Sequence, residues 1–166
     1  MAYSALAVAN AFIRRAQEGK IPDLTPMKLQ KLLFYVQSWY YKLRKQPLFD
    51  DVFTRWTYGP VIPSIYHEFK GYGGGEIKAP GTTVVPRPTQ ENPLAFEVVA
   101  PEINWNDQDA ISFIDEAVRV YGPISGWQLS QMTHQPGTAW DVSGPVDGGP
   151  IPLQMMADHI HPAKGD

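Results

Sequence analysis

The chain has 166 residues, and its 43% hydrophobic and 19% charged residues are typical of one globular domain with a core of its own. It contains no cysteine, which excludes disulfides, thiol catalysis and cysteine-ligated zinc. The net charge of −3 is unevenly divided: residues 1–72 hold ten Lys or Arg against five Asp or Glu, whereas residues 73–166 hold four against twelve.

The basic half of the chain has two interpretations. Its densest part has no acidic residue between Asp23 and Asp50 and contains Lys28, Lys31, Lys42, Arg44 and Lys45. A basic surface would suit nucleic acid or an acidic protein partner. The alternative is a solvated helix face whose charge is balanced within the molecule by the acidic half.

Two helices are predicted near the N-terminus. Apolar spacing predicts the first over residues 3–17, with Gly19 placed to end it. Its apolar stretch has no basic residue before it and is too short to cross a membrane, so we expect neither a signal peptide nor an anchor. The second helix is predicted over residues 26–45, because Thr25 can cap it and Pro26 suits the first helical position. Its wide apolar stripe predicts an amphipathic helix with the lysines on its exposed face.

The rest of the chain is expected to form shorter elements. Residues 49–58 are predicted to be extended or irregular, and a short helix follows over residues 63–70. Prolines exclude a long helix between residues 76 and 104, where short strands at 82–85 and 96–99 would form a hairpin or belong to a mobile loop. Further helices are predicted over residues 108–121, 125–131 and 153–159.

Together these elements predict a mainly α fold. We expect a compact single-domain helical bundle of about five to six helices over residues 1–166. It would carry a minor short β-hairpin or irregular Pro-rich segment around residues 76–104, and a flexible C-terminal tail from about residue 161.

Few residues are placed for catalysis or metal binding. His134 and Asp141 could form an acid–base pair, but a histidine beside a proline turn more often bonds backbone carbonyls. His159 and His161 could ligate a metal, yet no acidic ligand stands near them at a recognised spacing. We therefore expect no enzyme activity, no bound metal and no cofactor.

Tyrosine and tryptophan are concentrated in one part of the chain, with eight of them in residues 35–72. Helical spacing assigns about half of them to the core. The remainder are of the residue types that dominate protein interfaces, and the same residues stack on single-stranded bases. The pattern alone does not separate a protein partner from RNA.

Four blocks of the sequence together resemble a known family. They are residues 25–35 (TPMKLQKLLFY), 47–50 (PLFD), 56–66 (WTYGPVIPSIY) and 129–134 (LSQMTH), followed by Trp140. In this order they resemble the SocA-like antitoxin domain, also called the Panacea domain. The resemblance implies a cytoplasmic bacterial protein, often prophage-borne, that neutralises a toxin encoded beside it by protein–protein binding. Toxins paired with this family include translation inhibitors that resemble alarmone synthetases.

The resemblance leaves the mode of action open. Direct binding to the toxin is one mode, and the founding member of the family instead delivers its toxin to the ClpXP protease. A nucleic-acid-binding regulator is the third alternative, although no recognition helix or RNA motif is apparent. The expected partners are therefore a cognate toxin and, in the second mode, ClpXP; a homo-oligomer is left open, and neither a membrane nor nucleic acid is expected as a partner.

We expect the shared motifs mainly to build the scaffold, and partner choice to lie in exposed positions. The candidates for toxin binding are Lys28, Lys31, Tyr35 and Tyr41, together with segment 76–104. The scaffold positions are Thr25, Pro26, Leu29, Leu32, Trp56, Tyr58, Gly59, Pro60, Thr133, His134 and Trp140.

Overall fold

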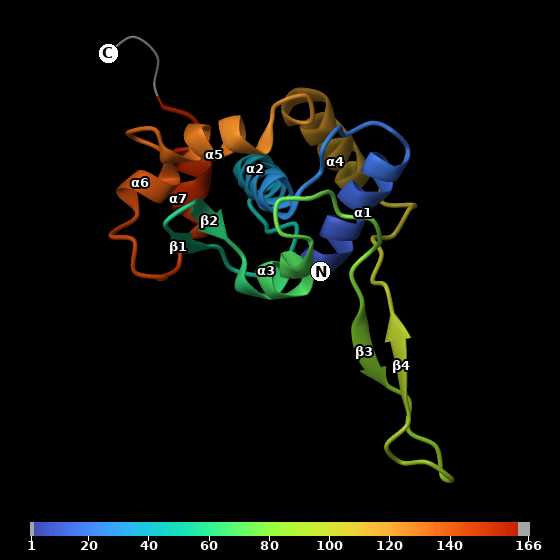
Figure 1. Cartoon of the computed structure of the whole chain (residues 1–166). Coiled ribbons are helices and arrows are strands. Elements are labelled where there is room, and N and C mark those ends of the chain that lie inside the picture. The colour runs from blue at the N-terminus through green and yellow to red at the C-terminus, as the bar shows by residue number, and fades with distance from the viewer. Residues whose placement is uncertain (1, 163–166) are drawn as a thin grey trace.

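The computed structural model describes residues 2–162, and one long helix, α2 (Pro26–Arg44), runs through the centre of its helical body (Figure 1). The helices that contact α2 are α1 (Ala5–Gln17), α3 (Pro63–Phe69), α4 (Gln108–Tyr121), α5 (Gly126–His134) and α7 (Leu153–Asp158). A short helix, α6 (Ala139–Val142), packs between α5 and α7, and a 3₁₀ turn, η1 (Lys70–Tyr72), extends α3. The prediction of a mainly α fold is confirmed; α6 was not predicted.

The helix starts follow signals that are present in the sequence. Thr25, Asp107 and Ser125 each accept a hydrogen bond on the side-chain oxygen from the backbone N–H three residues later. Gly19 adopts a positive φ of 81° just after the end of α1, a conformation that costs glycine little. The predicted bounds of the longer helices therefore agree with the structure within two or three residues.

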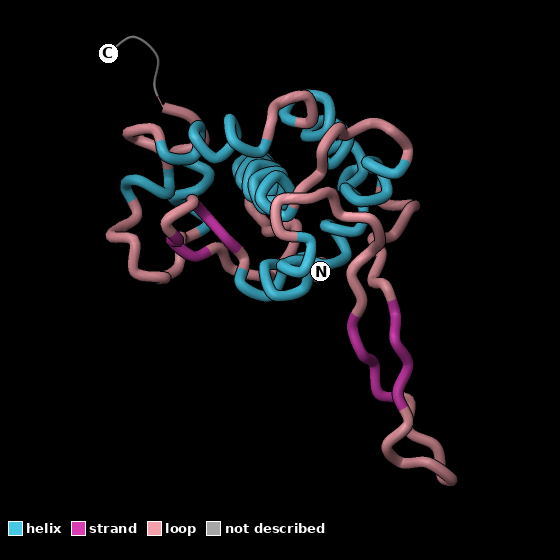
Figure 2. The backbone as a smooth tube through the Cα atoms, in the orientation of Figure 1, coloured by secondary structure: helices cyan, strands magenta, loops and turns pink. Residues whose placement is uncertain are grey.

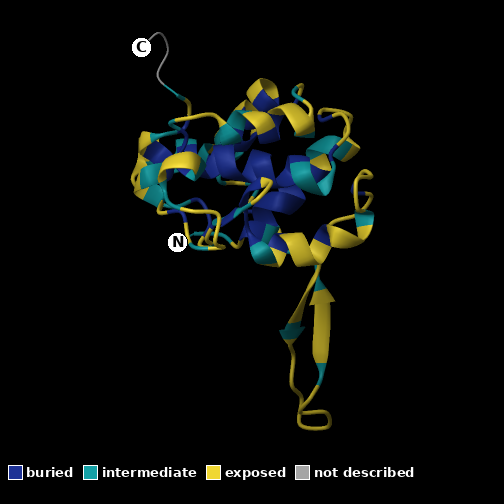
Figure 3. Ribbon diagram, turned by 60° about the vertical axis from the view of Figure 1, so that its left-hand side comes forward, coloured by how far each residue is buried: buried dark blue, intermediate teal, exposed yellow. Residues whose placement is uncertain are grey.

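Helix α2 is buried on every side from residue 28 to residue 38 (Figure 3). The expectation of an amphipathic helix with an exposed basic face is therefore wrong for this part. Five helices and a β-hairpin surround it, so no face is left for solvent. Its first two residues, Pro26 and Met27, are partly exposed, and its last turns, from residue 39 onward, reach the surface.

Buried amide side chains on α2 bind the backbone of the segments around it. Gln30 accepts the N–H of Ile62 at 2.9 Å and donates to its carbonyl at 3.0 Å. Gln37 accepts the N–H of Leu48 at 2.8 Å and donates to the carbonyl of Phe49 at 2.7 Å. The polar residues of this central helix thus satisfy backbone groups that would otherwise be buried without partners.

Two small antiparallel hairpins complete the fold (Figure 2). The first joins β1 (Thr54–Trp56) to β2 (Gly59–Val61), within and just beyond a region predicted to be extended or irregular. Gly59 has a φ of 109°, and a Cβ there would lie 2.8 Å from the Thr133 hydroxyl. Glycine at this position therefore permits both the backbone conformation and the close packing of β2 against α5.

The second hairpin joins β3 (Thr83–Pro86) to β4 (Phe96–Val99) and stands away from the helical body (Figure 1). Of the two forms predicted for segment 76–104, the hairpin is the one found. Its two ends are fixed by Asn10 of α1, whose side chain accepts the N–H of Gly81 at 2.8 Å and donates to the carbonyls of Gly81 and Pro101 at 3.0 Å. The arm is therefore free along its length and held at its base.

The C-terminal tail predicted from about residue 161 is described only as far as residue 162, and residues 163–166 lie outside the described part. Among the described residues, no helix is both long enough and apolar enough to cross a membrane.

Candidate protein-binding surfaces

The four residues predicted to bind a toxin do not share an exposed face. Lys28 and Lys31 are each only 1% exposed, and Tyr35 is fully buried. Tyr41 is partly exposed near the end of α2. The expectation that the two lysines lie on the surface is wrong, because both side chains point into the protein and bind carbonyl groups.

Lys28 links three parts of the chain. Its ammonium donates to the carbonyl of Pro22 at 2.8 Å and to that of Gly122 at 2.6 Å. Gly122 is the residue that ends α4, where the helix dipole places partial negative charge. Burial lowers the pKa of Lys28, and Asp23 opposes that shift. The geometry gives Lys28 a structural task at the end of α4.

Lys31 is buried with less compensation. Its amine donates to the carbonyl of Pro60 at 3.2 Å. No carboxylate among residues 2–162 lies within 4.0 Å of this amine. Burial alone lowers its pKa to about 7, because the charged form loses water without gaining a counter-charge.

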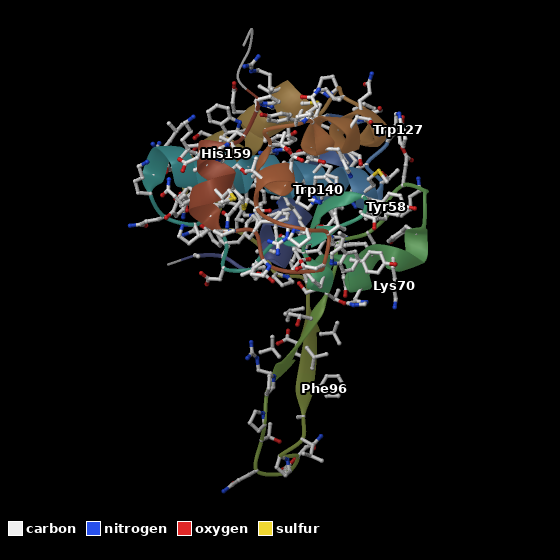
Figure 4. The ribbon with its side chains drawn as sticks, turned by 90° about the vertical axis from the view of Figure 1, so that its left-hand side faces the viewer. Tyr58, Lys70, Phe96, Trp127, Trp140 and His159 are labelled. Carbon is white, nitrogen blue, oxygen red and sulfur yellow. The ribbon has the colours of Figure 1, made fainter. Side chains whose placement is uncertain are left out.

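A pocket of about 180 Å³ opens beside Lys31. The first turns of α2, the β1–β2 hairpin and α3 form it, and apart from Lys31 and Gln30 its lining is mostly apolar and aromatic. Trp56 and Tyr66 meet edge to face at 5.0 Å, and Tyr58 is 68% exposed at the hairpin turn (Figure 4). The pocket therefore combines exposed aromatic side chains with a buried amine.

Tyr35 belongs to an aromatic stack inside the protein. Its ring lies parallel to that of Tyr121 at 4.2 Å and stacks on His161 at 5.4 Å. Burial raises the pKa of Tyr35, because the phenolate would be poorly solvated there. In this structure Tyr35 serves packing and is not available to a partner.

His134 and Trp140 join two of the sequence blocks. The ring nitrogens of His134 lie 2.6 Å from the carbonyl oxygen of Ser130 and 2.7 Å from that of Thr57. The indole of Trp140 packs on His134 at 4.3 Å and donates to the carbonyl of Trp56 at 2.9 Å. His134 thus ties α5 to the β1–β2 turn through backbone carbonyls.

The residues considered for acid–base or metal chemistry make other contacts. Asp141 accepts the N–H of Gly137 at 2.9 Å, and His161 contacts the hydroxyl of Tyr121 at 2.9 Å. Within residues 2–162 there is no group of three His, Asp or Glu side chains arranged to hold a metal ion.

The other scaffold positions support the same region. Leu29 and Leu32 are fully buried on α2, and Thr25 and Pro26 form its capped start. Thr133 is 1% exposed and donates to the carbonyl of Ser130.

The β3–β4 hairpin presents an apolar face to solvent. Val84 pairs with Val98 and Pro86 pairs with Phe96, so all four side chains project from the same face. Val84 and Val98 are each 58% exposed, and Phe96 is 64% exposed. Figure 4 shows Phe96 on the arm, well separated from the helical body. An isolated two-stranded hairpin is at best marginally stable in water. An exposed apolar face on such a hairpin is typical of an interaction site.

The charges of the two halves are balanced within the molecule. Arginines of the basic half form ion pairs with aspartates of the acidic half. These pairs are Arg15–Asp115 at 2.8 Å, Arg44–Asp109 at 2.6 Å and Arg55–Asp147 at 3.0 Å. With Lys28 and Lys31 also buried, the structure favours intramolecular balance over a continuous basic surface for nucleic acid.

Two residues that position these surfaces were not singled out from the sequence. Asn10 holds the base of the β3–β4 arm, and Arg55 donates to the carbonyls of Ser143, Pro145 and Pro150. A signal for Asn10 was present, because it is a polar residue inside an otherwise apolar helix segment.

Comparison with known proteins gives two matches. The model of the family described as "Antitoxin SocA-like, Panacea domain" matches residues 29–141. The chain is also 30% identical over 140 residues to a protein named Antitoxin SocA from Caulobacter vibrioides (strain NA1000 / CB15N). The matched region covers 83% of this chain and 69% of that protein. No solved structure matches the chain.

Proposed function

Because this chain belongs to the SocA-like antitoxin family with a Panacea domain, we propose that it is an antitoxin that neutralises a protein toxin by binding it directly. The relevant toxin would be the product of the gene beside its own. Neutralisation of this kind requires a well-packed interface and slow dissociation, and it requires no chemistry from the antitoxin.

The β3–β4 arm is the feature that most strongly supports direct binding. It is fixed at its base by Asn10 and carries Val84, Phe96 and Val98 on one exposed face. Moving each of these side chains from its present exposure into an interface would contribute roughly 1–2 kcal/mol. Such a face would be a liability on a protein that had no partner to cover it.

Co-expression tests the proposed function. The neighbouring gene is expressed alone and together with this protein, and cell growth is measured. We expect growth to be arrested in the first case and restored in the second. Toxicity that persists despite normal expression of this protein would contradict the proposal.

A paired substitution tests the contribution of the arm. Val84→Lys with Val98→Glu replaces two apolar residues that face each other by an opposite-charge pair, which keeps the cross-strand contact favourable. The control is Val85→Lys, which lies opposite Glu97 on the other face of the same hairpin. We expect the double variant to bind purified toxin at least about tenfold more weakly, since tenfold corresponds to 1.4 kcal/mol, and the control to bind like the wild type. Equal binding by all three proteins would remove the arm from the interface.

A further inference from the structure

Lys31 has hydrogen-bonding capacity that residues 2–162 do not use. An ammonium group carries three donors, and the structure provides one acceptor, the carbonyl of Pro60. A lysine as fully buried as this one is normally paired with an acid. Within residues 2–162 its amine has no carboxylate within 4.0 Å, although eight ion pairs form elsewhere in that part of the chain. A buried donor without a counter-charge is a feature that a ligand can complete.

The surroundings of Lys31 favour an anion. The pocket of about 180 Å³ beside it is lined by no acidic residue. Pro26 and Met27, in the first turn of α2, also line the pocket, so the positive end of a 19-residue helix dipole lies at its wall. The volume is suited to one side chain with a short apolar stem. The site therefore combines positive potential with room for a single small group.

The rim of the pocket indicates that the group belongs to a protein. Tyr58 is 68% exposed and Tyr66 is 42% exposed, and Trp56 packs against Tyr66. Tyrosine and tryptophan around a desolvated centre are typical of the most strongly contributing positions in protein interfaces. An anchor residue of the partner would place its apolar atoms against these rings and its polar end at Lys31.

We propose that this pocket receives a glutamate or aspartate side chain of the toxin, whose carboxylate pairs with the amine of Lys31. This inference rests on the proposed function, since it names a contact within the same antitoxin–toxin complex. The pairing would supply the counter-charge that residues 2–162 do not provide, and the surrounding rings would exclude water from it. Charge-assisted hydrogen bonds of this kind are about twice as strong as neutral ones.

Binding through Lys31 would depend on pH. In the free protein burial lowers the pKa of Lys31 to about 7, whereas a bound carboxylate would favour the ammonium form and raise that pKa again. Toxin binding would therefore take up a proton and weaken as the pH rises, by about tenfold between pH 7 and pH 8.5. A Cβ on Gly59 would lie 3.0 Å from the Lys31 amine and 3.3 Å from Cε1 of His134, so within residues 2–162 His134 of α5 is a titratable group near the amine. Tyr58 and Tyr66 stand at the rim of the same pocket.

The test measures the affinity of the full chain for purified, catalytically inactivated toxin at pH 7 and pH 8.5. Lys31→Met keeps the length of the side chain and removes its charge, and Lys45→Met makes the same change at an exposed position on the end of the same helix. We expect Lys31→Met to bind at least about tenfold more weakly at pH 7 and to lose the pH dependence, and Lys45→Met to behave like the wild type. Equal affinity of Lys31→Met and wild type would overturn the inference.

Two further experiments keep the test of Lys31 decisive. If Lys31→Met does not fold, Tyr58→Asp and Tyr58→Lys test the pocket from its exposed rim. The Tyr58→Asp variant should bind the toxin at least about tenfold more weakly than Tyr58→Lys. Equal binding by these two variants would overturn the inference. Replacing each surface Glu and Asp of the toxin by Gln or Asn should identify one position whose loss is not additive with Lys31→Met. Full additivity at every position would equally overturn it. If the wild type fails to bind the toxin at all, the proposed function itself fails.

Discussion

Replacing Lys31 by methionine should abolish a gain in stability that the wild type shows as the pH rises above 7. Burial lowers the pKa of Lys31 from 10.5 to about 7. Between these two values the unfolded chain keeps the proton that the folded chain has released, so a rise in pH favours the folded state. From pH 7 to pH 9 the gain is about 2 kcal/mol, because each unit of pH within this window contributes at most about 1.36 kcal/mol.

The assay is chemical unfolding followed by tryptophan fluorescence, for both proteins, at pH 7 and pH 9. The difference between the two proteins isolates Lys31, since all other titrating groups are common to both. We expect the free energy of unfolding of the wild type to rise by about 2 kcal/mol more than that of Lys31→Met over this range. Parallel pH dependence in the two proteins would refute the reasoning, because it would mean that the folded protein holds the Lys31 ammonium as well as water does.

Three other substitutions test contacts that shape the surfaces. Lys28→Met should lower the free energy of unfolding by about 3 kcal/mol, measured by urea titration, since it removes two charge-assisted hydrogen bonds, one to the buried carbonyl of Gly122 and one to the carbonyl of Pro22; unchanged stability would contradict this role. Asn10→Ala should leave the helical body folded but increase hydrogen exchange at Gly81 and along residues 81–101, and unaltered exchange there would show that another contact holds the arm. Arg55→Lys should lower the free energy of unfolding by about 2 kcal/mol in the same assay, because a lysine cannot donate to all four acceptors that the guanidinium binds. Stability equal to that of the wild type would contradict this.

Local signals in the sequence predicted the longer helices well. The start of α2 is encoded by Thr25 and Pro26, and that of α4 by Asp107, all of which act on backbone groups within one turn. The strands of the β3–β4 hairpin were also placed to within a residue, because the prolines around them leave few other conformations.

Short elements were harder to predict. The β1–β2 hairpin has strands of three residues, too short for an alternating pattern to be recognised, so residues 49–58 were predicted only as extended or irregular. Helix α6 has four residues and depends on its packing against α5 and α7. Such elements are determined by tertiary contacts, which outweigh local propensity over so few residues.

The surfaces could be predicted only in part. Aromatic clustering in residues 35–72 predicted interface-type residues but no pocket, and three of them, Trp56, Tyr58 and Tyr66, line it. For segment 76–104 a hairpin was one of the two predicted forms, and it is the form found. The burial of Lys28 was not predictable, because one of its acceptors, the carbonyl of Gly122, is 94 residues away in the sequence. A helical periodicity analysis treats every lysine as exposed, and it fails where the fold brings distant carbonyl groups to a lysine side chain.

Titration of the purified toxin with the purified protein tests the central claim most directly. The activity of the toxin is measured in a reaction that contains no protease, while increasing amounts of this protein are added. Direct neutralisation predicts that the activity falls to background once the protein equals the toxin in concentration. Full toxin activity in the presence of excess folded protein would contradict the account. If in that case the protein shortens the half-life of the toxin in cells only when ClpXP is present, its function is proteolytic delivery.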